Sequence, residues 1–351
     1  MTGPAFHRPS EDDTGSRPRA DAHLAAREIL RRAAAAAARA PSIHNTQPWR
    51  FVLGPDWLEL HIDRTRRLTV LDPRARQLIT SCGCALLNMR VAIAAAGREA
   101  VARRFPDPDR GAVVARVWVG DGPGSGELAS LEPVIGERRT NRREYADEPV
   151  PDTLITRLRR IAREEQVQLT PVTSPEHRRD ISELSAIAEF AEQSDPAYMG
   201  ELARWTTDDP RRLDGVQAAS VPYRGPGGFQ HDPIPIRPFD QLGMGWLPAA
   251  SNSGREQCLL LLSGSDDAPL TWLHTGEALE RIWLELTAEA FWASPLTAAI
   301  EVAATRDELR RRLGRPGYPQ LLLRVGRAPE TVPTPRRPLA DVLVEEVDSD
   351  E

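Results

Sequence analysis

The sequence predicts an α+β fold in which one unit of helices and strands occurs twice. Two long apolar helices are predicted around Gly83 and Gly276, and each of these glycines opens the same Gly-x-Ala-Leu pattern. A strand is predicted after each helix, and the apolar run at 321–326 repeats the pattern of 115–120. Two diverged copies explain this self-similarity most simply, and they can pack inside one chain as the subunits of a homodimer do. We therefore expect an internal pseudo-dimer.

The first copy is predicted to begin with a helix, a hairpin and a second helix. Asp21 is a suitable N-cap for a helix that reaches about Arg39, because apolar residues recur along this run at helical spacing. Strands are predicted at 49–53 and 58–62 with a Gly-Pro-Asp turn between them, so we expect a hairpin. The apolar stripe at 78–96 ends at a glycine and predicts a long, largely buried helix.

The second copy repeats these elements around a long insertion. Asp152 is predicted to cap its first helix and Thr275 its long central helix. The segment at about 195–250 is rich in proline and glycine and has no clear periodicity. A long irregular insertion in a compact domain is usually functional or mobile, so this segment is either a lid over a site or an exposed linker.

These patterns divide the chain into two halves between two tails. The predicted parts are a disordered tail at 1–20, a first half at 21–130, a second half at 131–340 that contains the insertion, and an acidic tail at 341–351.

The charge of the chain excludes several classes of protein. The formal net charge is -6, and the basic clusters are short, so we do not expect nucleic acid as a partner. All 45 basic residues are arginine. A lysine Schiff base and a Walker A loop are therefore excluded, because both chemistries require lysine.

The three cysteines do not indicate a metal site or a disulfide framework. Cys82 and Cys84 lie in an apolar helical run and Cys258 begins an apolar strand, with no histidine close to either. Reduced, buried thiols in a cytoplasmic protein are the simplest interpretation. No apolar run is expected to span a bilayer, and we expect no membrane partner.

The segment Ala40–Phe51 carries the strongest chemical signal. Two prolines, a serine, an asparagine and a glutamine follow an alanine-rich helix directly and lead into a strand. Pro41 prevents the helix from continuing, which leaves a stiff polar loop. Such a loop suits a planar heteroaromatic ligand with several donors and acceptors, for example a flavin ring.

A second signal is the basic run Glu137–Tyr145, which has four arginines in six residues. Like charges at this density need solvent or anions, and arginine forks fit a phosphate group with geometric specificity. Arg336 and Arg337 form another basic pair after the last predicted strand. A solvated surface is the alternative interpretation for both clusters.

Together these segments resemble the nitroreductase family, and most closely its Acg-like tandem branch. The loop resembles the flavin-ring loop of that family, and the basic run resembles its Arg-Arg-Ser-x-Arg motif. The resemblance implies a nitroreductase-like fold duplicated in one chain, with flavin mononucleotide (FMN) held between the halves. The residues it assigns to the cofactor are Pro41, Ser42, Ile43, Asn45, Gln47, Arg138, Arg139, Thr140, Arg142, Arg336 and Arg337.

Only one complete flavin site is expected. The first half has the ring loop but no such arginine run near its start, and the second half has the run but no such loop. One FMN per chain and a monomeric protein are therefore predicted. The resemblance also places a backbone amide near flavin N5, for which Thr297 and Ala298 are candidates. His44 is expected to pack against the loop or hydrogen-bond within it, with a general-base role as the alternative.

The resemblance implies an FMN-dependent oxidoreductase that takes hydride from NADPH or NADH. Ping-pong transfer through flavin N5 to a small-molecule electron acceptor, a nitroaromatic or a quinone, is the expected reaction. The alternative is an FMN-binding or storage protein with little reductase activity, because a lid that covers the ring would keep nicotinamide away from it.

Overall fold

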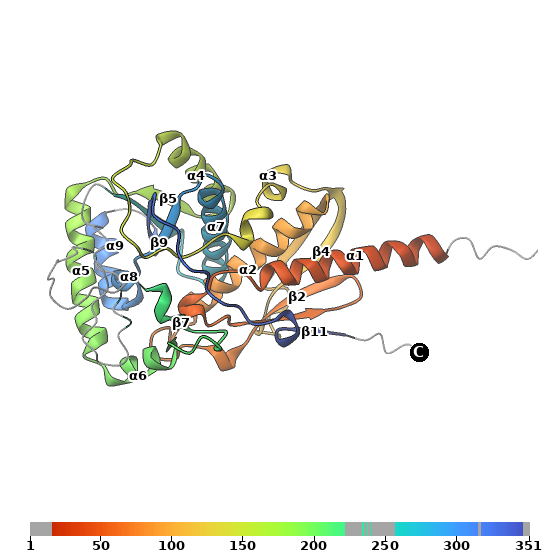
Figure 1. Cartoon of the computed structure of the whole chain (residues 1–351), viewed down its shortest axis with the longest axis horizontal. Coiled ribbons are helices and arrows are strands. Elements are labelled where there is room, and N and C mark those ends of the chain that lie inside the picture. The colour runs from red at the N-terminus through yellow and green to blue at the C-terminus, as the bar shows by residue number, and fades with distance from the viewer. Residues whose placement is uncertain are drawn as a thin grey trace, which may run out of the picture.

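The structure, a computed structural model, describes residues 16–221, 234, 237, 239, 257–314 and 317–346. Within them, two long helices occupy the centre, α2 (Arg76–Ala95) and α7 (Pro269–Ala288), and a β-sheet lies on either side of this pair (Figure 1). The predicted mixture of helix and sheet is confirmed. Most of the lid-like insertion predicted at 195–250 lies outside the described residues.

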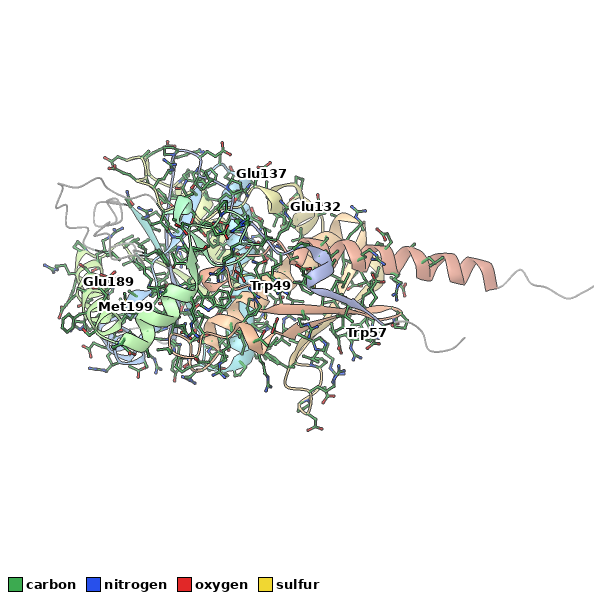
Figure 2. The ribbon with its side chains drawn as sticks, turned by 60° about the horizontal axis from the view of Figure 1, so that its bottom comes forward. Trp49, Trp57, Glu132, Glu137, Glu189 and Met199 are labelled. Atoms are coloured by element: carbon green, nitrogen blue, oxygen red, sulfur yellow. The ribbon has the colours of Figure 1, made fainter. Side chains whose placement is uncertain are left out.

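The first sheet is built mainly from residues before 130. Its strands are β1 (Trp49–Leu53), β2 (Trp57–Ile62), β3 (Arg98–Arg104), β4 (Val113–Pro123) and β11 (Leu343–Glu345), in the order β11-β1-β2-β4-β3. The pair β1–β2 is antiparallel with Trp49 opposite Ile62, which confirms the predicted hairpin. Figure 2 shows Trp49, which is fully buried, nearer the centre of the molecule than Trp57.

The strand β11 differs from the acidic tail predicted at 341–351. Leu343 pairs with Phe51 in a parallel register, so the end of the chain returns to the first sheet. Arg27 and Arg31 of helix α1 (Ser16–Ala37) bind Glu345 at 3.1 and 2.8 Å and hold the strand there. Glu345, within the predicted acidic tail, thus anchors the strand to α1.

The second sheet comes from the other part of the chain. Its strands are β5 (Gln168–Pro171), β8 (Cys258–Gly264), β9 (Trp292–Pro295) and β10 (Tyr318–Gly326), in the order β5-β8-β10-β9. Two short parallel strands, β6 (Thr206–Thr207) and β7 (Val216–Gln217), form a separate ladder. The predicted strand at 321–326 lies within β10, whose residues between Pro319 and Gly326 are all buried.

The helices α2 and α7 meet at two glycines. A Cβ atom on Gly83 would overlap the backbone oxygen of Leu273, and one on Gly276 would overlap that of Thr80. Each such atom would also lie 2.8 Å from the Cα atom of the opposite glycine. The two backbones can therefore approach this closely only because both positions lack a side chain.

The helix α2 is long and apolar enough to cross a membrane by length and composition, which corrects the expectation that no run reaches that limit. However, 83% of its most apolar stretch is buried inside the protein. Its apolar character is explained by its position in the core, between α7 and the first sheet.

The remaining helices cover the two sheets and fill the ends of the molecule. They are α3 (Gly126–Ala129), α4 (Asp152–Glu164), α5 (Pro175–Gln193), α6 (Pro196–Arg204), α8 (Ala298–Glu301) and α9 (Ala303–Leu313). The short 3-10 turns are η1 (Ile43–Asn45), η2 (Arg64–Arg66), η3 (Pro133–Gly136), η4 (Ala218–Ser220) and η5 (Leu339–Asp341). Figure 2 shows Glu189 of α5 and Met199 of α6 at the end of the molecule opposite the projecting part of α1.

Three predicted helix starts differ from the structure. The helix α1 already begins at Ser16, within the tail predicted as disordered and before the predicted cap Asp21. Asp152 is the first residue of α4, after Pro151, and makes no side-chain cap. Thr275 lies inside α7, and its hydroxyl donates to the backbone oxygen of Thr271. The helix extends back to Pro269 because Trp272 and Leu273 are buried in the core and extend the apolar face.

Candidate functional site

The polar loop between α1 and β1 has an unusual backbone. His44, Asn45 and Gln47 have φ angles of 45°, 53° and 49°, in the left-handed region that non-glycine residues rarely adopt. The backbone N–H of Gln47 donates to Ser42 Oγ at 2.9 Å, and the backbone N–H of Ile43 donates to Ser81 Oγ of α2 at 3.1 Å. These bonds hold a strained loop in one shape, as is common at ligand-binding sites.

Two predicted ring-binding residues bind other parts of the protein instead. Asn45 Nδ2 donates to the backbone oxygens of Gly215 and Pro335, each at 3.2 Å. Gln47 donates to the backbone oxygen of Leu213 at 2.8 Å and accepts from the Arg337 amide at 2.8 Å. These bonds hold the loop against neighbouring segments, and neither side chain lines the cavity that lies in front of the loop.

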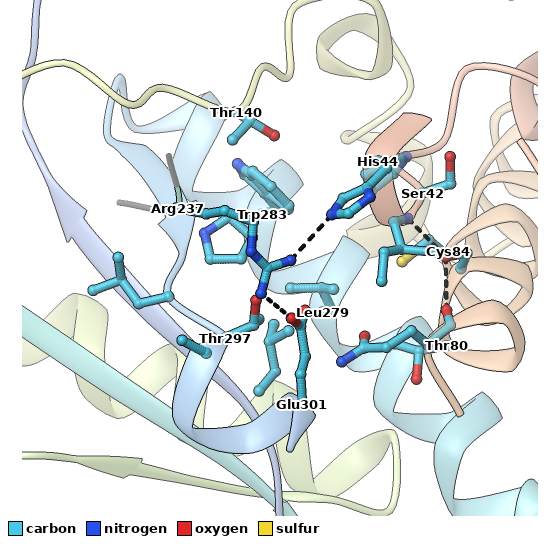
Figure 3. Close-up of a pocket in the computed structure, with 18 of the residues that line it drawn as sticks. Ser42, His44, Thr80, Cys84, Thr140, Arg237, Leu279, Trp283, Thr297 and Glu301 are labelled. Atoms are coloured by element: carbon cyan, nitrogen blue, oxygen red, sulfur yellow. Dashed lines mark hydrogen bonds and ion pairs between the residues drawn. The ribbon is translucent and has the colours of Figure 1, made fainter. Parts of the chain in front are cut away.

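A cavity of about 140 Å³ lies in front of this loop, between α2 and α7 (Figure 3). We call it the ring cavity. It is lined by the loop residues Pro41, Ser42, Ile43 and His44, by Gln77, Thr80, Ser81 and Cys84 of α2, by Leu279 and Trp283 of α7, and by Thr140, Arg142, Arg237, Phe239, Pro295, Leu296, Thr297, Ala298, Glu301 and Leu321. Segments from both predicted halves thus meet in one space, which has both apolar and polar lining residues.

A second cavity of about 300 Å³ adjoins the first at Thr140, which lines both. We call it the arginine cavity. Four arginines line it, namely Arg39, Arg138, Arg139 and Arg336, together with Ile135, Gly136, Pro333 and Thr334. The buried side chain of Asn141 donates to the backbone oxygen of Pro329 at 2.8 Å, which fixes the run that carries Thr140.

The positive charges in the arginine cavity are incompletely compensated. Burial, together with the neighbouring Arg138, lowers the pKa of Arg336 to about 9. Burial and the charges of Arg138 and Arg39 likewise lower the pKa of Arg139. Burial raises the pKa of the nearby Glu280 to about 7, although Arg138 Nε lies 3.3 Å from its carboxylate. An anion bound among these groups would relieve the repulsion between them.

The basic run supplies residues to both cavities. Arg138 is buried, with its guanidinium 5.0 Å from the ring of Trp283, and Arg139 reaches the arginine cavity. Arg142 lines the ring cavity, with its guanidinium 5.3 Å from the ring of Phe239. A run of five residues thus spans the whole candidate site.

The other predicted site residues divide into two groups. Thr297 and Ala298 line the ring cavity at the start of α8, and Arg336 lines the arginine cavity. Arg337 lines neither cavity, and its guanidinium donates to the backbone oxygen of Asp341 at 2.9 Å.

The prediction from sequence missed a charged group in the ring cavity. Arg237 Nη1 lies 3.1 Å from His44 Nε2, and the same guanidinium pairs with Glu301 (Figure 3). It also pairs with Glu192. No local pattern marks these residues, because they are 45 to 193 positions apart. Thr80 and Ser81 could have been found, since two adjacent polar residues are unusual in the apolar run of α2.

The three cysteines are free, and the thiols of Cys82 and Cys84 are buried. Within the described part of the chain, no group of three metal-binding side chains occurs.

Comparison with known proteins identifies relatives along most of the chain. No family model matches it. The Mycobacterium tuberculosis H37Rv protein named "Putative NAD(P)H nitroreductase Rv3131" is 36% identical over 327 residues, which cover 92% of each chain. The protein of that strain named "Putative NAD(P)H nitroreductase acg" is 29% identical over 330 residues, 90% of this chain and 95% of the relative.

A solved structure also matches part of this chain. The FMN and NADPH-dependent nitroreductase NfnB from Sphigopyxis sp. strain HMH matches with a TM-score of 0.38 and 18% identity, over 62% of this chain and 99% of that chain. The sequence relatives confirm the predicted resemblance to nitroreductases and to Acg. With 36% identity to a relative over 92% of its length, this chain belongs to the NAD(P)H nitroreductase family.

Proposed function

We propose that this chain binds one FMN across the ring and arginine cavities and acts as an NAD(P)H-dependent oxidoreductase. The observation that carries the proposal is that Thr140 lines both cavities. One space combines apolar and polar lining residues, as a planar heteroaromatic ring requires, and the other gathers four arginines, as a phosphate requires.

The donor set fits FMN at both ends. Arg139 and Arg336 would hold the phosphate, because their guanidinium groups reach a cavity whose positive charge is not balanced. Trp283 and Leu279 would pack against the ring, while Ser42 and Thr80 line the polar part of its cavity. When bound, FMN supplies hydride chemistry at its N5 atom.

Three residues in the ring cavity would tune that chemistry. Arg142 places a positive charge beside the ring, which favours the negative charge that a reduced flavin carries. Thr297 and Ala298 bring backbone to the same cavity, and we propose their amides as the groups that face N5. None of these residues has to exchange a proton in this role.

The relatives' name, NAD(P)H nitroreductase, supports NADPH or NADH as the electron donor and a nitroaromatic as one acceptor. We extend the acceptors to quinones, which are also planar and electron-poor. Donor and acceptor would approach the same bound flavin ring in turn, and the reaction would be ping-pong.

We further propose that the chain is a duplicated unit that works as a monomer. The symmetry of the contact between Gly83 and Gly276 supports two related halves, one before and one after residue 130. The cytoplasm is the proposed location, since α2, the one apolar helix of sufficient length in the described residues, is largely buried.

Two measurements test the function. The purified chain is expected to hold one FMN, and a ratio near two would contradict the single site. Anaerobic mixing with NADPH or NADH is then expected to bleach the bound flavin rapidly. A flavin that only dithionite bleaches would instead support the storage alternative. That alternative is already favoured by one observation, namely that Arg237 and Phe239 of the predicted insertion line the ring cavity.

A further inference from the structure

The hydrogen bond between His44 and Arg237 fixes the position of the imidazole proton. Arg237 Nη1 lies 3.1 Å from His44 Nε2. A guanidinium group has donors only, so Nε2 has to accept, and a neutral imidazole then carries its proton on Nδ1.

Arg237 is itself held in place by two carboxylates. Its Nη2 atom pairs with Glu301, and it lies 3.3 Å from Glu192. Glu192 also accepts a hydrogen bond of 3.1 Å from the Tyr198 hydroxyl. The side chains of Arg237, Glu192 and Glu301 are each at most 11% exposed, so solvent weakens these contacts little. His44 thus faces a fixed donor.

The surroundings keep the imidazole neutral. Burial, followed by the charge of Arg237, lowers the pKa of His44 to about 3. Arg142 acts in the same direction and Glu301 in the opposite one. At neutral pH His44 therefore has no proton to release as an acid, and its basic atom is occupied by Arg237. This arrangement argues against the general-base alternative considered from the sequence.

The remaining polar atom of His44 lacks a partner. Among the residues that the structure describes, nothing hydrogen-bonds to the buried Nδ1 atom. A buried donor without an acceptor is costly, and such groups often serve a ligand. His44 lines the ring cavity, and its ring meets that of Phe239 edge to face, with centroids 5.7 Å apart and planes at 80°. The two rings form an aromatic corner beside this donor.

We propose that His44 is the fixed hydrogen-bond donor that recognises an oxygen atom of the electron acceptor, a nitro oxygen or a quinone carbonyl. In this proposal Arg237 is a positioning residue that acts through His44 by setting its tautomer. The inference rests on the proposed function, because it assigns the acceptor of that reaction. Acceptors without such an oxygen gain nothing from His44.

Replacing His44 by phenylalanine tests the donor role, because phenylalanine retains a ring but has no N–H group. His61→Phe is the matched control, since His61 pairs with Glu59 on β2 and lines neither cavity. Flavin in each protein is first reduced and then oxidised by menadione or by ferricyanide. For His44→Phe we expect the menadione rate to fall about tenfold more than the ferricyanide rate, with both rates measured on the flavin-loaded fraction.

The outcomes separate the two proposals. Equal losses with both oxidants, or no loss with menadione, would each overturn the role of His44 as the acceptor's donor. If NAD(P)H cannot reduce the flavin of the wild-type chain, the proposed function is contradicted. The role of His44 can still be tested in that case, because dithionite can reduce the flavin before menadione or ferricyanide oxidises it.

A spectroscopic measurement tests the tautomer without turnover. In the ¹⁵N-labelled chain, His44 is expected to show a protonated Nδ1 and an unprotonated Nε2, with no titration between pH 5 and 8. Arg237→Met is expected to allow the other tautomer and to raise the titration toward the usual value near 6.5, while Arg237→Lys retains a donor and restores the wild-type pattern. A protonated Nε2, or titration near neutrality in the wild type, would overturn the assignment.

Discussion

The contact between α2 and α7 has two unlike sides. The residue after the contact glycine of α2 is Cys84, which lines the ring cavity together with Trp283 of α7. The residue after the contact glycine of α7 is Glu277, which is ion-paired at 2.7 Å with Arg90 of α2. Trp283 lies seven residues after Gly276, and Arg90 lies seven residues after Gly83. The same backbone arrangement thus encloses space on one side and an ion pair on the other.

The ion-paired side is filled by a larger charge network. Glu277 is fully buried and also binds Arg104 at 2.6 Å. Arg90 binds Glu165 at 2.7 Å, and Glu165 in turn binds Arg281 at 3.1 Å. Paired charged side chains fill this side, whereas Cys84 and Trp283 line a cavity on the other. The two flanks of one helix contact can therefore differ as much as a cavity differs from a packed ion-pair network.

The largest expected effect comes from breaking the ion-paired side. Glu277→Ala leaves Arg90 and Arg104, which are 18% and 25% exposed, with one fewer carboxylate, and is expected to cost about 3 kcal/mol of unfolding free energy. Cys84→Ala, at the equivalent position on the cavity side, removes one sulfur atom from a cavity wall and is expected to cost about 1 kcal/mol. Chemical denaturation of both variants measures the difference. Equal losses would mean that the two sides are not energetically distinct.

The second prediction removes the phosphate donors on the cavity side. Arg139→Ala combined with Arg336→Ala is expected to weaken FMN binding roughly 10²- to 10⁴-fold, since two charge-assisted contacts are lost. Arg337→Ala is the control, because its guanidinium lies outside both cavities. Fluorescence titration with FMN gives the three affinities. A loss in the control as large as that in the double variant would remove the assignment of the arginine cavity.

The third prediction uses Glu280, the buried carboxyl next to Arg138. Its pKa is about 7 in the folded chain and near 4.5 when unfolded, so the folded state binds the proton more tightly. Its contribution to stability is therefore full below pH 4.5 and is lost as the pH rises through 7. In flavin-free protein, the stability of Glu280→Gln relative to wild type is expected to rise by about 3 kcal/mol from pH 4.5 to 8. Denaturation curves at the two pH values measure it, and a constant difference would contradict the raised pKa.

Sequence reasoning located the central helices well but not all of their neighbours. The repeated Gly-x-Ala-Leu pattern indicates two similar helices, and both of its glycines lie at the helix contact. The strand β11 was missed because its three residues carry no periodic signal and pair with β1, about 290 positions earlier. Parallel pairing at that separation depends on tertiary structure, which a local pattern does not encode.

The site was predicted in part for the same reason. Loop and arginine motifs identify segments by local composition, and Pro41, Ser42 and Arg139 do reach the two cavities. Motifs do not reveal which way a side chain points, and the left-handed backbone turns Asn45 away from the ring cavity. Arg237 went unnoticed because its importance comes from partners that are remote in sequence.

The smallest expected effect concerns the shape of the loop itself. Asn45→Ala removes two hydrogen bonds to Gly215 and Pro335 and places alanine at a φ of 53°, which asparagine tolerates better. A loss of about 1–2 kcal/mol in stability is expected, with FMN binding weakened at most tenfold, because Asn45 does not line the ring cavity. Denaturation and FMN titration of the same protein separate the two quantities. A drop in FMN affinity as large as that of the double arginine variant would show that Asn45 binds the ring directly, as the sequence had predicted.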